Sequence, residues 1–572
     1  MDEFRQSIAK ALESAIGLKG FDEKTIFGML ESPPAKELGD AAFPAFKLAP
    51  LLKKAPKDIA QEIVEKLKLP KEISEAKAIG PYVNFFFSKE ALAKDILADI
   101  LSQKESFGKN KYFGGKKIVV EYSQPNTNKP LHIGHLRNNA LAMSAGMLLE
   151  KSGAKVKRVD LFNDRGIHIC QSMLAYQKWG NNGSPEKEKM KSDHFVGKFY
   201  VLYHQKEKEL PELKTELQEM LQKWEKGDKK VLVLWKKMNK WAEDGFKKTY
   251  KDFGSRFDKR YKESAIYKKA KPIIEQGLKK GIFFCDEKGA VLCDLEKFGL
   301  GKKTILREDG TSIYITQDLA LAKLKFEDFK FDRSVYVVAS EQRTYFLQLF
   351  KILELLGFGF ADKLFHLSYG LVNLPEGKLK SREGKIVDAD GLIFDLTELS
   401  RKEILSRYMG LSKKEVEKRA AAIALGAIKF YMLKTDPVKD VLFDPAKAIS
   451  FDGDSGPYVM YSYARAKSIL RKEAAPKKFD AALLAAESEK GILSLLNNFE
   501  TVVMQSAKGF APSKLCNYLL ELSSAFNTFY HKEPVLTAEK NVKGARLALV
   551  KAVSVVLASG LKLLNITPLE EM

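Results

Sequence analysis

The sequence predicts an α/β protein with a doubly wound parallel sheet, preceded by a small α+β domain and followed by an all-α helical bundle. Three observations predict this class. Strand-like apolar segments alternate with helix-like segments between residues 117 and 372, the pattern of parallel strands joined by crossover helices. Residues 1–108 mix helical periodicity with one strand-like segment, and after residue 395 only helical periodicity remains.

In the first domain, "DIAQEIVEKL" has helical spacing, "GPYVNFFFS" resembles a strand, and "QKESFGKNKYFGGKK" reads as a polar linker. The next domain opens with the apolar strand "KKIVVEYSQ", a helix over 134–152 and the strand "KVKRVDLFND". Further strands are expected at 311–316, 334–340 and 365–372, with the helix "FLQLFKILELLG" among them. This alternation predicts a Rossmann-like sheet.

Two later stretches read as helices only. Residues 181–250 are rich in Lys and Glu and break the strand-helix rhythm, so we expect a helical insertion in the nucleotide-binding domain. The last third, including "RAAAIALGAIKFYMLK" and "NVKGARLALVKAVSVVLASGLKLL", has apolar residues at helical spacing and predicts a bundle. The expected domains are therefore 1–108, 109–395 and 396–572.

Length and composition set the outer limits. At 572 residues the chain exceeds the size at which one hydrophobic core stops growing, so two to four domains are expected. With 96 Lys and Arg against 74 Asp and Glu, the net charge of +22 indicates a polyanionic partner such as nucleic acid. A surface solvated by excess lysine would give the same balance, so charge alone leaves both interpretations open.

The sequence gives no sign of export or of a membrane span. The start, "MDEFRQSIAKALESAIG", reads as an amphipathic helix without the features of a secretory signal, so we expect a cytoplasmic protein. We expect no apolar run that approaches the roughly 20 residues of a membrane span. The four cysteines, which include no Cys-x-x-Cys pair, predict neither a disulfide framework nor a cysteine zinc site: Cys170, Cys285, Cys293 and Cys516.

Two histidines mark the turn between the first strand and helix of the central domain. His132 and His135 stand in "SQPNTNKPLHIGHLRNNA", with Gly134 between them. Zinc needs three or four ligands, and no further ligand joins the pair locally, so we predict no metal site. Packing or capping of the helix start is the plain alternative. In a doubly wound fold, however, nucleotide phosphates bind at such a helix N-terminus, where the imidazoles could stabilise phosphate charge.

These residues carry a family resemblance. "LHIGHLRN" resembles the HIGH signature of class I aminoacyl-tRNA synthetases, and "VEYSQPNTNKPLHIGHLRNNA" resembles the arginyl-tRNA synthetase form of it. "ELGDAAFPAFKLAPLLKKAPKDIAQEI" resembles the family's N-terminal tRNA-binding domain, "YITQDLALA" and "YVVASEQRTYFLQLF" its catalytic segments, and "GPYVMYSYARAKSILRK" its anticodon-binding domain. The resemblance implies ATP-dependent ligation of L-arginine to its cognate tRNA through an arginyl-adenylate. It also implies Mg2+ bound with ATP rather than in a protein cage, and a monomer.

The resemblance also assigns roles around ATP. It places His132 and His135 at the α-phosphate and Gly134 near adenine. The second class I signature, KMSKS, corresponds to "EGKLKSREGKIV", in which the usual second lysine is replaced by serine. The family is thought to compensate with a lysine just upstream of HIGH, here Lys129. The ATP-binding residues expected in the degenerate motif are Lys378, Lys380, Ser381 and Arg382.

Arginine specificity requires buried carboxylates, because a guanidinium is a planar, permanently charged fork that an acid holds with two hydrogen bonds. By resemblance, Tyr314 and Asp318 lie at the guanidinium, Glu121 and Asn126 near the amino-acid backbone groups, and Gln342 close by. A helix N-cap after the strand expected at 311–316 is the alternative for Asp318. The carboxyl end of a parallel strand, which faces the ligand crevice, favours the binding role.

Contacts to tRNA are expected in both terminal domains. Tyr458, Tyr461 and Arg465 share one helical face, and aromatic plus arginine surfaces suit unstacked anticodon bases. Core packing explains the tyrosines equally well. By resemblance Tyr82 and Asn84 read a tRNA loop, but a half-buried strand accounts for them nearly as well.

Two competing functions remain open at this point. Another class I synthetase, such as a cysteinyl or glutamyl enzyme, is opposed by the missing cysteine zinc ligands and by the extended "NTNKPLHIGH" and terminal helices. A catalytically dead tRNA-binding paralogue is suggested by the degenerate lysine motif alone. The intact His132, Gly134, His135, Glu121 and Asp318 oppose it.

Overall fold

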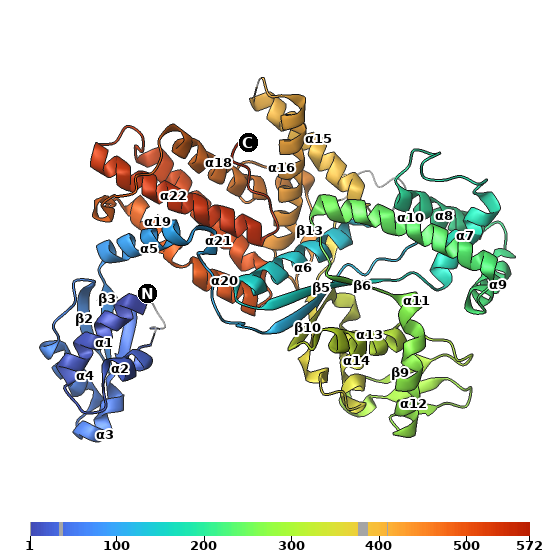
Figure 1. Ribbon diagram of the computed structural model, residues 1–572, viewed down its shortest axis with the longest axis horizontal. Helices are drawn as coiled ribbons and strands as arrows, with labels where there is room; N and C mark the ends of the chain where they lie inside the picture. The colour runs from blue at the N-terminus through green and yellow to red at the C-terminus, as the bar shows by residue number, and fades with distance from the viewer. Residues whose placement is uncertain (1, 32, 34–37, 376–386, 409) are drawn as a thin grey trace. The chain divides into compact units, whose positions relative to one another are not determined.

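The computed structural model describes residues 2–31, 33, 38–375, 387–408 and 410–572 (Figure 1). The chain forms two compact units. The first consists of Met1–Phe107, Ala466–Asn497 and Ala525–Val556, and the second of Gly108–Arg465, Asn498–Ser524 and Leu557–Met572.

The second unit is built on a five-stranded parallel sheet. Its strands are β4 (Lys117–Glu121), β5 (Lys155–Phe162), β6 (Lys259–Lys262), β10 (Arg333–Ala339) and β11 (Leu364–Tyr369). They lie in the order β11-β10-β4-β5-β6, and every neighbouring pair is parallel. The predicted doubly wound sheet is therefore confirmed. The strand order reverses between β4 and β10, and ligands bind at such a switch point, outside the carboxyl ends of the strands.

Helix α6 (Ile133–Lys151) follows β4 and is covered on several sides. It packs against β5, β10 and the helices α16 (Lys413–Lys434) and α20 (Phe499–Lys508), so 14 of its 19 residues are buried. Burial on several sides explains why its sequence has little one-sided periodicity. Other helices of this unit lie in the chain between or after these strands: α7 (Ile167–Trp179), α11 (Glu263–Ile266), α12 (Lys271–Lys279), α14 (Arg343–Leu355), α15 (Ala389–Arg407) and α17 (Pro445–Ala448).

The prediction of a strand at 311–316 was wrong. Helix α13 (Tyr314–Phe329) begins there instead, and the Ile313 backbone N–H donates to Thr316 Oγ1 at 3.1 Å across its first turn. The β-branched residues alternate locally like a strand, but Ile315, Leu319 and Ala322 recur at helical spacing and are buried in the core. Tertiary burial thus overrides the local strand propensity.

A second, antiparallel sheet in this unit had no clear sequence signal. It contains β7 (Phe283–Cys285), β8 (Val291–Asp294) and β9 (Lys302–Leu306), in the order β7-β8-β9. Its strands are only three to five residues long, too short for a clear alternating pattern. A two-stranded parallel pair, β12 (Val372–Asn373) with β13 (Val441–Leu442), was likewise not expected.

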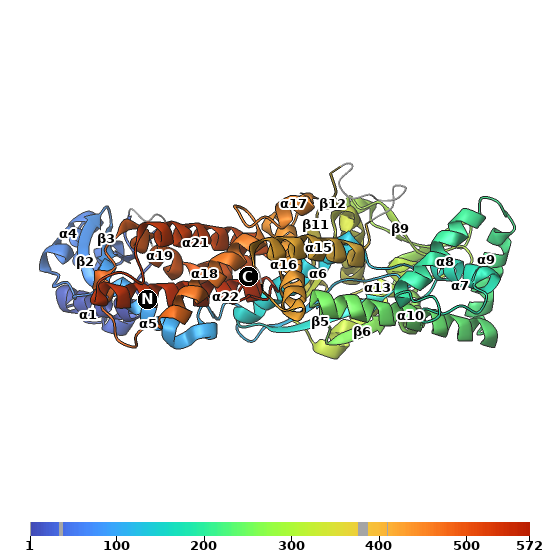
Figure 2. The same ribbon diagram turned by 90° about the horizontal axis from the view of Figure 1, so that it is seen from above.

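The stretch predicted as a helical insertion is helical. Helices α8 (Ser192–Lys206), α9 (Leu213–Glu225) and α10 (Lys229–Phe253) lie in the chain between α7 and β6. Both views show these helices packed beside α7 (Figures 1 and 2). The amphipathic α10 turns its buried face, which includes Phe246 and Tyr250, toward the rest of the unit.

The N-terminal part of the first unit is an α+β fold, as predicted. Strands β1 (Ala41–Pro44), β3 (Tyr82–Phe87) and β2 (Ile73–Ile79) form an antiparallel sheet in that order. Phe4 of α1 (Asp2–Ile16) stacks on Phe87 of β3 with ring centroids 4.7 Å apart. The other helices are α2 (Glu23–Met29), α3 (Ala49–Leu52), α4 (Pro56–Lys66) and α5 (Lys89–Gln103).

The C-terminal third is helical, as predicted. Its helices are α18 (Gly456–Lys472), α19 (Glu487–Asn497), α20, α21 (Pro512–Lys532) and α22 (Lys540–Leu563). The expectation that no segment is long and apolar enough to span a membrane was wrong for α22, whose mean hydropathy reaches 1.6 over an 18-residue window. However, 78% of that window is buried inside the protein, as in the core helix of a folded domain.

Candidate active site

The turn after β4 has an unusual backbone. Ser123 and Gln124 have φ angles of 77° and 45°, in the left-handed region that residues with a side chain seldom adopt. The Ser123 N–H donates to Asn138 Oδ1 at 2.7 Å, and the Gln124 N–H donates to Asp160 Oδ1 at 3.1 Å. Side chains from α6 and β5 therefore stabilise a conformation that is otherwise costly, a feature concentrated at functional sites.

His132 and His135 cap the start of α6 reciprocally. The Gly134 N–H donates to His132 Nδ1 at 3.2 Å, and the His132 N–H donates to His135 Nδ1 at 3.1 Å. Because both Nδ1 atoms accept, a neutral ring carries its proton on Nε2. No described residue takes up either Nε2–H, so the cap leaves two donors at a helix N-terminus.

The pair is neutral at physiological pH. Burial, aided by the positive charge of Lys129, lowers the pKa of His132 to about 4. Burial and the neighbouring His132 and Lys129 also lower the pKa of His135 well below its ordinary value. Burial lowers the pKa of Lys129 as well. A side chain at Gly134 would place its Cβ 3.0 Å from His132 Cε1, so glycine preserves the position of this imidazole.

The turn that contains His132 and His135, which we call the histidine turn, pairs with the chain that follows residue 386. The Ala389 N–H donates to the Leu131 carbonyl at 2.9 Å, and the Ile133 N–H donates to the Val387 carbonyl at 3.0 Å. His132 and Asp388 form the antiparallel bridge between these bonds. The four predicted ATP-binding residues of the degenerate motif, Lys378, Lys380, Ser381 and Arg382, lie outside the described residues.

Arg137 of α6 holds the chain that precedes the degenerate motif. Its buried guanidinium donates to the carbonyls of Gly370 (2.6 Å), Leu371 (2.9 Å), Pro437 (3.2 Å) and Lys439 (2.6 Å). Burial lowers its pKa. The helix that begins with the histidine pair thus also orders the end of β11 and the entry to β12.

A group of buried carboxylates lies at the carboxyl end of the same sheet. Glu121 ends β4, is 4% exposed and forms an ion pair with the fully buried Lys325 of α13. The Lys325 ammonium also lies 3.5 Å from the centroid of the Tyr336 ring. Asp318, two turns earlier on α13, accepts a hydrogen bond from Tyr345. Burial and the nearby Glu121 raise the pKa of Asp318 to about 7.

Glu263, just after β6, extends this group. It is 5% exposed and accepts a hydrogen bond of 2.6 Å from Gln317 Nε2. Burial, with the negative charges of Asp164 and Asp318, raises its pKa to about 7. We call Glu121, Glu263 and Asp318 the carboxylate group. Glu121 and Glu263 are buried and Asp318 is half-buried, so the ionised forms of these acids favour a positive partner.

Asp318 is therefore brought together with Glu121, but the stated reason for its position was wrong. Residues 311–316 do not form a strand, and Asp318 is not a helix N-cap, because α13 begins four residues earlier at Tyr314. Tyr314 is 58% exposed at the first position of that helix. Glu263 and Lys325 were missed. The seven-residue spacing from Asp318 to Lys325 is a signal for one helical face, whereas Glu263 depends on the unpredicted β6.

The other residues predicted to contact arginine lie on the rim of the sheet. Asn126 forms an isolated parallel bridge with Asn163, which prolongs the pairing of β4 with β5. Gln342 is exposed at the N-cap of α14, three residues before Tyr345. His168, just after β5 in the chain, is exposed, and its Nδ1 lies 3.2 Å from Gln171 Oε1.

The residues predicted to bind tRNA differ in exposure. Arg465 lies over the Tyr461 ring, 4.8 Å from its centroid, and Tyr458 is half-buried on the same helix. Tyr82 is half-buried and packs edge-on against Phe46. Asn84 is only 4% exposed, and its amide donates to the Leu38 carbonyl at 2.6 Å. Its side chain supports the fold instead of offering a surface to RNA, which corrects that prediction.

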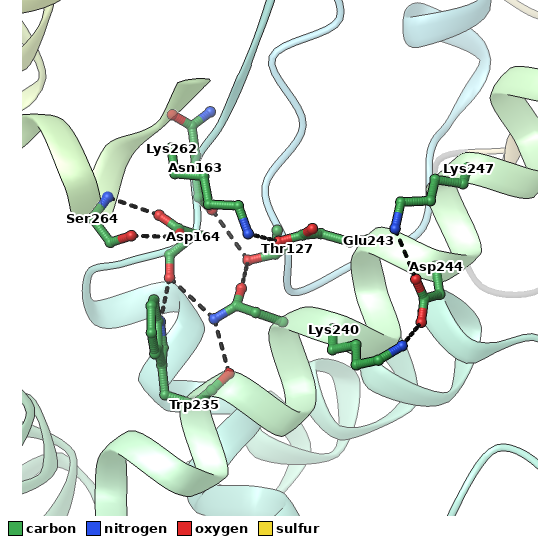
Figure 3. A network of polar contacts seen from close by, with 11 residues as sticks. Thr127, Asn163, Asp164, Trp235, Lys240, Glu243, Asp244, Lys247, Lys262 and Ser264 are labelled. Atoms are coloured by element: carbon green, nitrogen blue, oxygen red, sulfur yellow. Dashed lines mark hydrogen bonds and ion pairs between the residues drawn. The ribbon is translucent and has the colours of Figure 1, made fainter. Parts of the chain in front are cut away.

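The insertion is tied to the signature segment (Figure 3). Asp164, just after β5, accepts from the Ser264 N–H and Oγ at 2.8 and 2.7 Å. Its carbonyl accepts from Trp235 Nε1 of α10 at 2.5 Å. Asn239 of α10 accepts a hydrogen bond from Thr127, within the "PNTN" turn, and donates to the same Asp164 carbonyl at 3.3 Å. The long helix α10 is thus anchored directly beside the histidine turn.

The described side chains do not offer a caged metal site. Within that part of the chain, one group of possible ligands lies within 4.8 Å: Asp193, His194 and Asp390. The Lys191 ammonium lies 3.0 Å from Asp193 and 2.7 Å from Asp390, so a cation already occupies the position between the acids. This arrangement does not fit a resident divalent ion.

Three protein families match successive parts of the chain. Residues 96–445 match the family described as tRNA synthetases class I (R), catalytic domain. Residues 2–87 match the arginyl tRNA synthetase N terminal domain, and residues 459–572 match the DALR anticodon binding domain. The chain belongs to the arginyl-tRNA synthetase family.

Relatives in the family match along almost the whole chain. The arginine–tRNA ligase of Treponema denticola is 45% identical over 559 residues, which cover 95% of this chain and 94% of that protein. The arginine–tRNA ligase of Treponema pallidum is 40% identical and covers 100% of this chain and 99% of its own length. The structure of Thermus thermophilus arginyl-tRNA synthetase has a TM-score of 0.78 at 28% identity, covering 99% of this chain and 100% of that chain.

Proposed function

We propose that the chain ligates L-arginine to its cognate tRNA through an arginyl-adenylate, with release of AMP and pyrophosphate. The observation that carries the proposal is that two sites of complementary charge preference lie at the carboxyl ends of the same sheet's strands. A neutral histidine pair begins α6, and the carboxylate group comprises Glu121 at the end of β4, Glu263 just after β6 and Asp318 on α13. The first suits a phosphate and the second suits a guanidinium.

The first step joins the arginine carboxylate oxygen to the α-phosphorus of ATP and breaks the bond to pyrophosphate. No proton needs to be removed from the carboxylate, so positioning and charge stabilisation carry this step. The Nε2–H groups of His132 and His135 donate to the phosphate region where negative charge develops. The positive end of the α6 helix dipole adds to this stabilisation.

Arginine recognition follows from the charge of the carboxylate group. A guanidinium beside Asp318 and Glu263 would restore the ionised form of both acids, which burial disfavours. We place Tyr314 beside this position and assign Asn126 and Glu121 to the backbone groups of the amino acid. A substrate with a neutral side chain of similar size would leave the charges of the acids uncompensated. The buried Lys325 neutralises Glu121, so Asp318 and Glu263 are the two acids of the group that remain to face the positive charge of the substrate.

We assign charge neutralisation on ATP to Lys129 and to the motif residues Lys378, Lys380, Ser381 and Arg382. Mg2+ would arrive bound to the ATP phosphates, since it prefers phosphate and water oxygens to a protein cage. When bound it would neutralise phosphate charge. Comparing Lys129→Ala with Lys378→Ala separates the two contributions. Unchanged ATP affinity and rate in Lys129→Ala would show that Lys129 does not compensate for the missing lysine of the degenerate motif.

Binding of tRNA is assigned to both ends of the chain. We propose that Tyr458, Tyr461 and Arg465 contact anticodon bases, and that Tyr82 contacts a tRNA loop. The net charge of +22 supports a polyanionic partner. The domain limits 1–108, 109–395 and 396–572, a monomeric state and a cytoplasmic location remain predictions.

The test is formation of labelled arginyl-tRNA from ATP, labelled arginine and tRNA, with AMP release measured in parallel. Charging with arginine, and not with lysine, glutamate or cysteine, is the expected result. A chain that binds tRNA without releasing AMP would instead be the dead paralogue. Arginine-dependent pyrophosphate exchange with and without tRNA then tests whether activation requires tRNA, as we expect.

A further inference from the structure

A cluster of charged residues joins the insertion to the chain beside the histidine turn. Asp390 Oδ2, in the first turn of α15, lies 2.7 Å from Lys191 Nζ and 2.8 Å from His194 Nε2. Thr249 Oγ1 of α10 donates to Asp390 Oδ1 at 2.9 Å. Lys191 also contacts Asp193 at 3.0 Å and donates to Thr249 at 2.6 Å. We call Lys191, His194, Thr249 and Asp390 the anchoring cluster.

The anchoring cluster lies one residue from the backbone pair that borders His132. Residues 387–389 pair with residues 131–133, and Asp388 stands opposite His132 in this pair. Asp388 Oδ1 also caps α15 by accepting from the Gly391 N–H at 2.8 Å, and it lies 3.8 Å from His194 Nε2. A shift of Asp390 would therefore move the strand that holds the His132 backbone.

Helix α8 contacts the same turn on its other flank. A Cβ at Gly197 would lie 2.7 Å from Pro130 Cδ and 3.5 Å from Lys129 Cα, so the helix backbone packs closely on the residues just before the signature. His194 stands one turn earlier on this helix. One helix thus touches the turn directly through Gly197 and holds its paired strand through His194.

We propose that Asp390 and His194 are positioning residues that orient the histidine turn for adenylate formation. They act through the pairing of residues 387–389 with residues 131–133, without touching substrate. The inference rests on the proposed function, because it assigns a role within that reaction.

The charge balance makes this position sensitive to pH. The acids that face His194 are Asp193, Asp388 and Asp390, and Lys191 is the other cation. The hydrogen bond to Asp390 raises the pKa of His194 above its ordinary value. Burial alone would raise the pKa of Asp390, but His194, Lys191 and Thr249 lower it to about 2. The charged His194 therefore holds Asp390 at low pH, and this contribution is lost as pH rises through the raised pKa.

The first test compares Asp390→Asn with Asp328→Asn in tRNA-dependent arginine:pyrophosphate exchange. Asp328 is a matched control, because its side chain is 29% exposed against 27% for Asp390 and it also accepts from a lysine and a hydroxyl, Lys259 and Tyr261. We expect Asp390→Asn to lower kcat about tenfold or more with the KM for arginine within twofold of wild type. Asp328→Asn should leave both within twofold.

Equal kcat values in the two variants, or a joint change of kcat and the arginine KM in Asp390→Asn, would overturn the inference. The wild-type chain in the same assay tests the proposed function separately. If the wild type neither exchanges pyrophosphate nor charges tRNA, the proposed function fails. An active wild type with an unaffected Asp390→Asn overturns the positioning role alone.

The second test uses His194→Gln, which keeps a donor near Nε2 but does not titrate, and so remains informative if Asp390→Asn fails to fold. We expect wild-type kcat to fall about two- to fivefold as pH rises past the pKa of His194, and the variant to lack this fall. A pH profile of kcat identical to that of the wild type would overturn the inference.

Discussion

The histidine turn and the carboxylate group experience the same burial with opposite results. Burial removes the positive charge of His132, whose pKa falls to about 4, and opposes the negative charge of Asp318, whose pKa rises to about 7. The histidines still satisfy their Nδ1 atoms within the cap, and so they remain effective as neutral donors. Lys325 pairs with Glu121, but Asp318 and Glu263 accept hydrogen bonds from neutral side chains, Tyr345 and Gln317, and a bound cation would favour their ionised forms.

The difference indicates that ATP binds at the histidine turn and that arginine binds at the carboxylate group. The turn is complete before ATP binds, because its hydrogen bonds fix both rings and their tautomers. The carboxylate group is completed only by a bound guanidinium. Changes in the group should therefore alter the arginine requirement, and changes in the turn should alter the rate.

The largest expected effect comes from Asp318→Asn. Removing one partner of a buried charge pair costs roughly 3–5 kcal/mol, which corresponds to about 10²- to 10⁴-fold in kcat/KM for arginine. The loss should appear mainly in the arginine KM, measured by charging kinetics over a range of arginine concentrations. An unchanged arginine KM would remove Asp318 from the pocket.

A rate loss of ~100-fold is expected for His132→Asn, the scale for losing one transition-state donor. Asparagine is a good N-cap that can still accept from the Gly134 N–H, so the thermal midpoint should change little. Single-turnover adenylate formation with tRNA present measures the rate. A variant with near wild-type rate would mean that His132 serves only as a cap. His135→Ala should lose a similar factor.

The pH dependence of the arginine KM should separate the two regions. Asp318 has a raised folded pKa of about 7, so it is ionised above pH 7 and becomes protonated as pH falls below it. The arginine KM should then rise by up to tenfold per pH unit below 7. His132 stays neutral between pH 6 and 8, so it adds no change of kcat there. An arginine KM that is flat from pH 6 to 8 would contradict the pKa of Asp318.

The smallest effect is expected for Gly134→Ala. The new Cβ would lie 3.0–3.1 Å from the His132 ring, which must shift by a few tenths of an ångström. Alanine is otherwise favoured over glycine in a helix by about 1 kcal/mol. We expect kcat to fall roughly five- to tenfold, from the scale of one perturbed donor, while the melting temperature stays level or rises. Wild-type kcat would show that the turn tolerates displacement of the imidazole.

The sequence predicted those features of the fold and the site that local patterns encode. The β4-α6-β5 unit and the histidine pair follow from hydrophobic periodicity and a contiguous motif. The left-handed Ser123 and Gln124 were not predictable, because Asn138 and Asp160 stabilise them from elsewhere in the fold. The same holds for Glu263, which follows the short and mostly exposed strand β6. Helix α13 was mistaken for a strand at its start because burial, not propensity, decides its conformation.

The most direct test is the number of protons released when arginine binds. Isothermal titration calorimetry with tRNA present, in two buffers of different ionisation enthalpy at pH 6.5, measures this number. We predict net proton release by the wild-type chain, because the guanidinium returns Asp318 and Glu263 to their ionised forms, and a smaller release by Asp318→Asn. Arginine binding with no proton release, or equal release by the variant, would contradict the account.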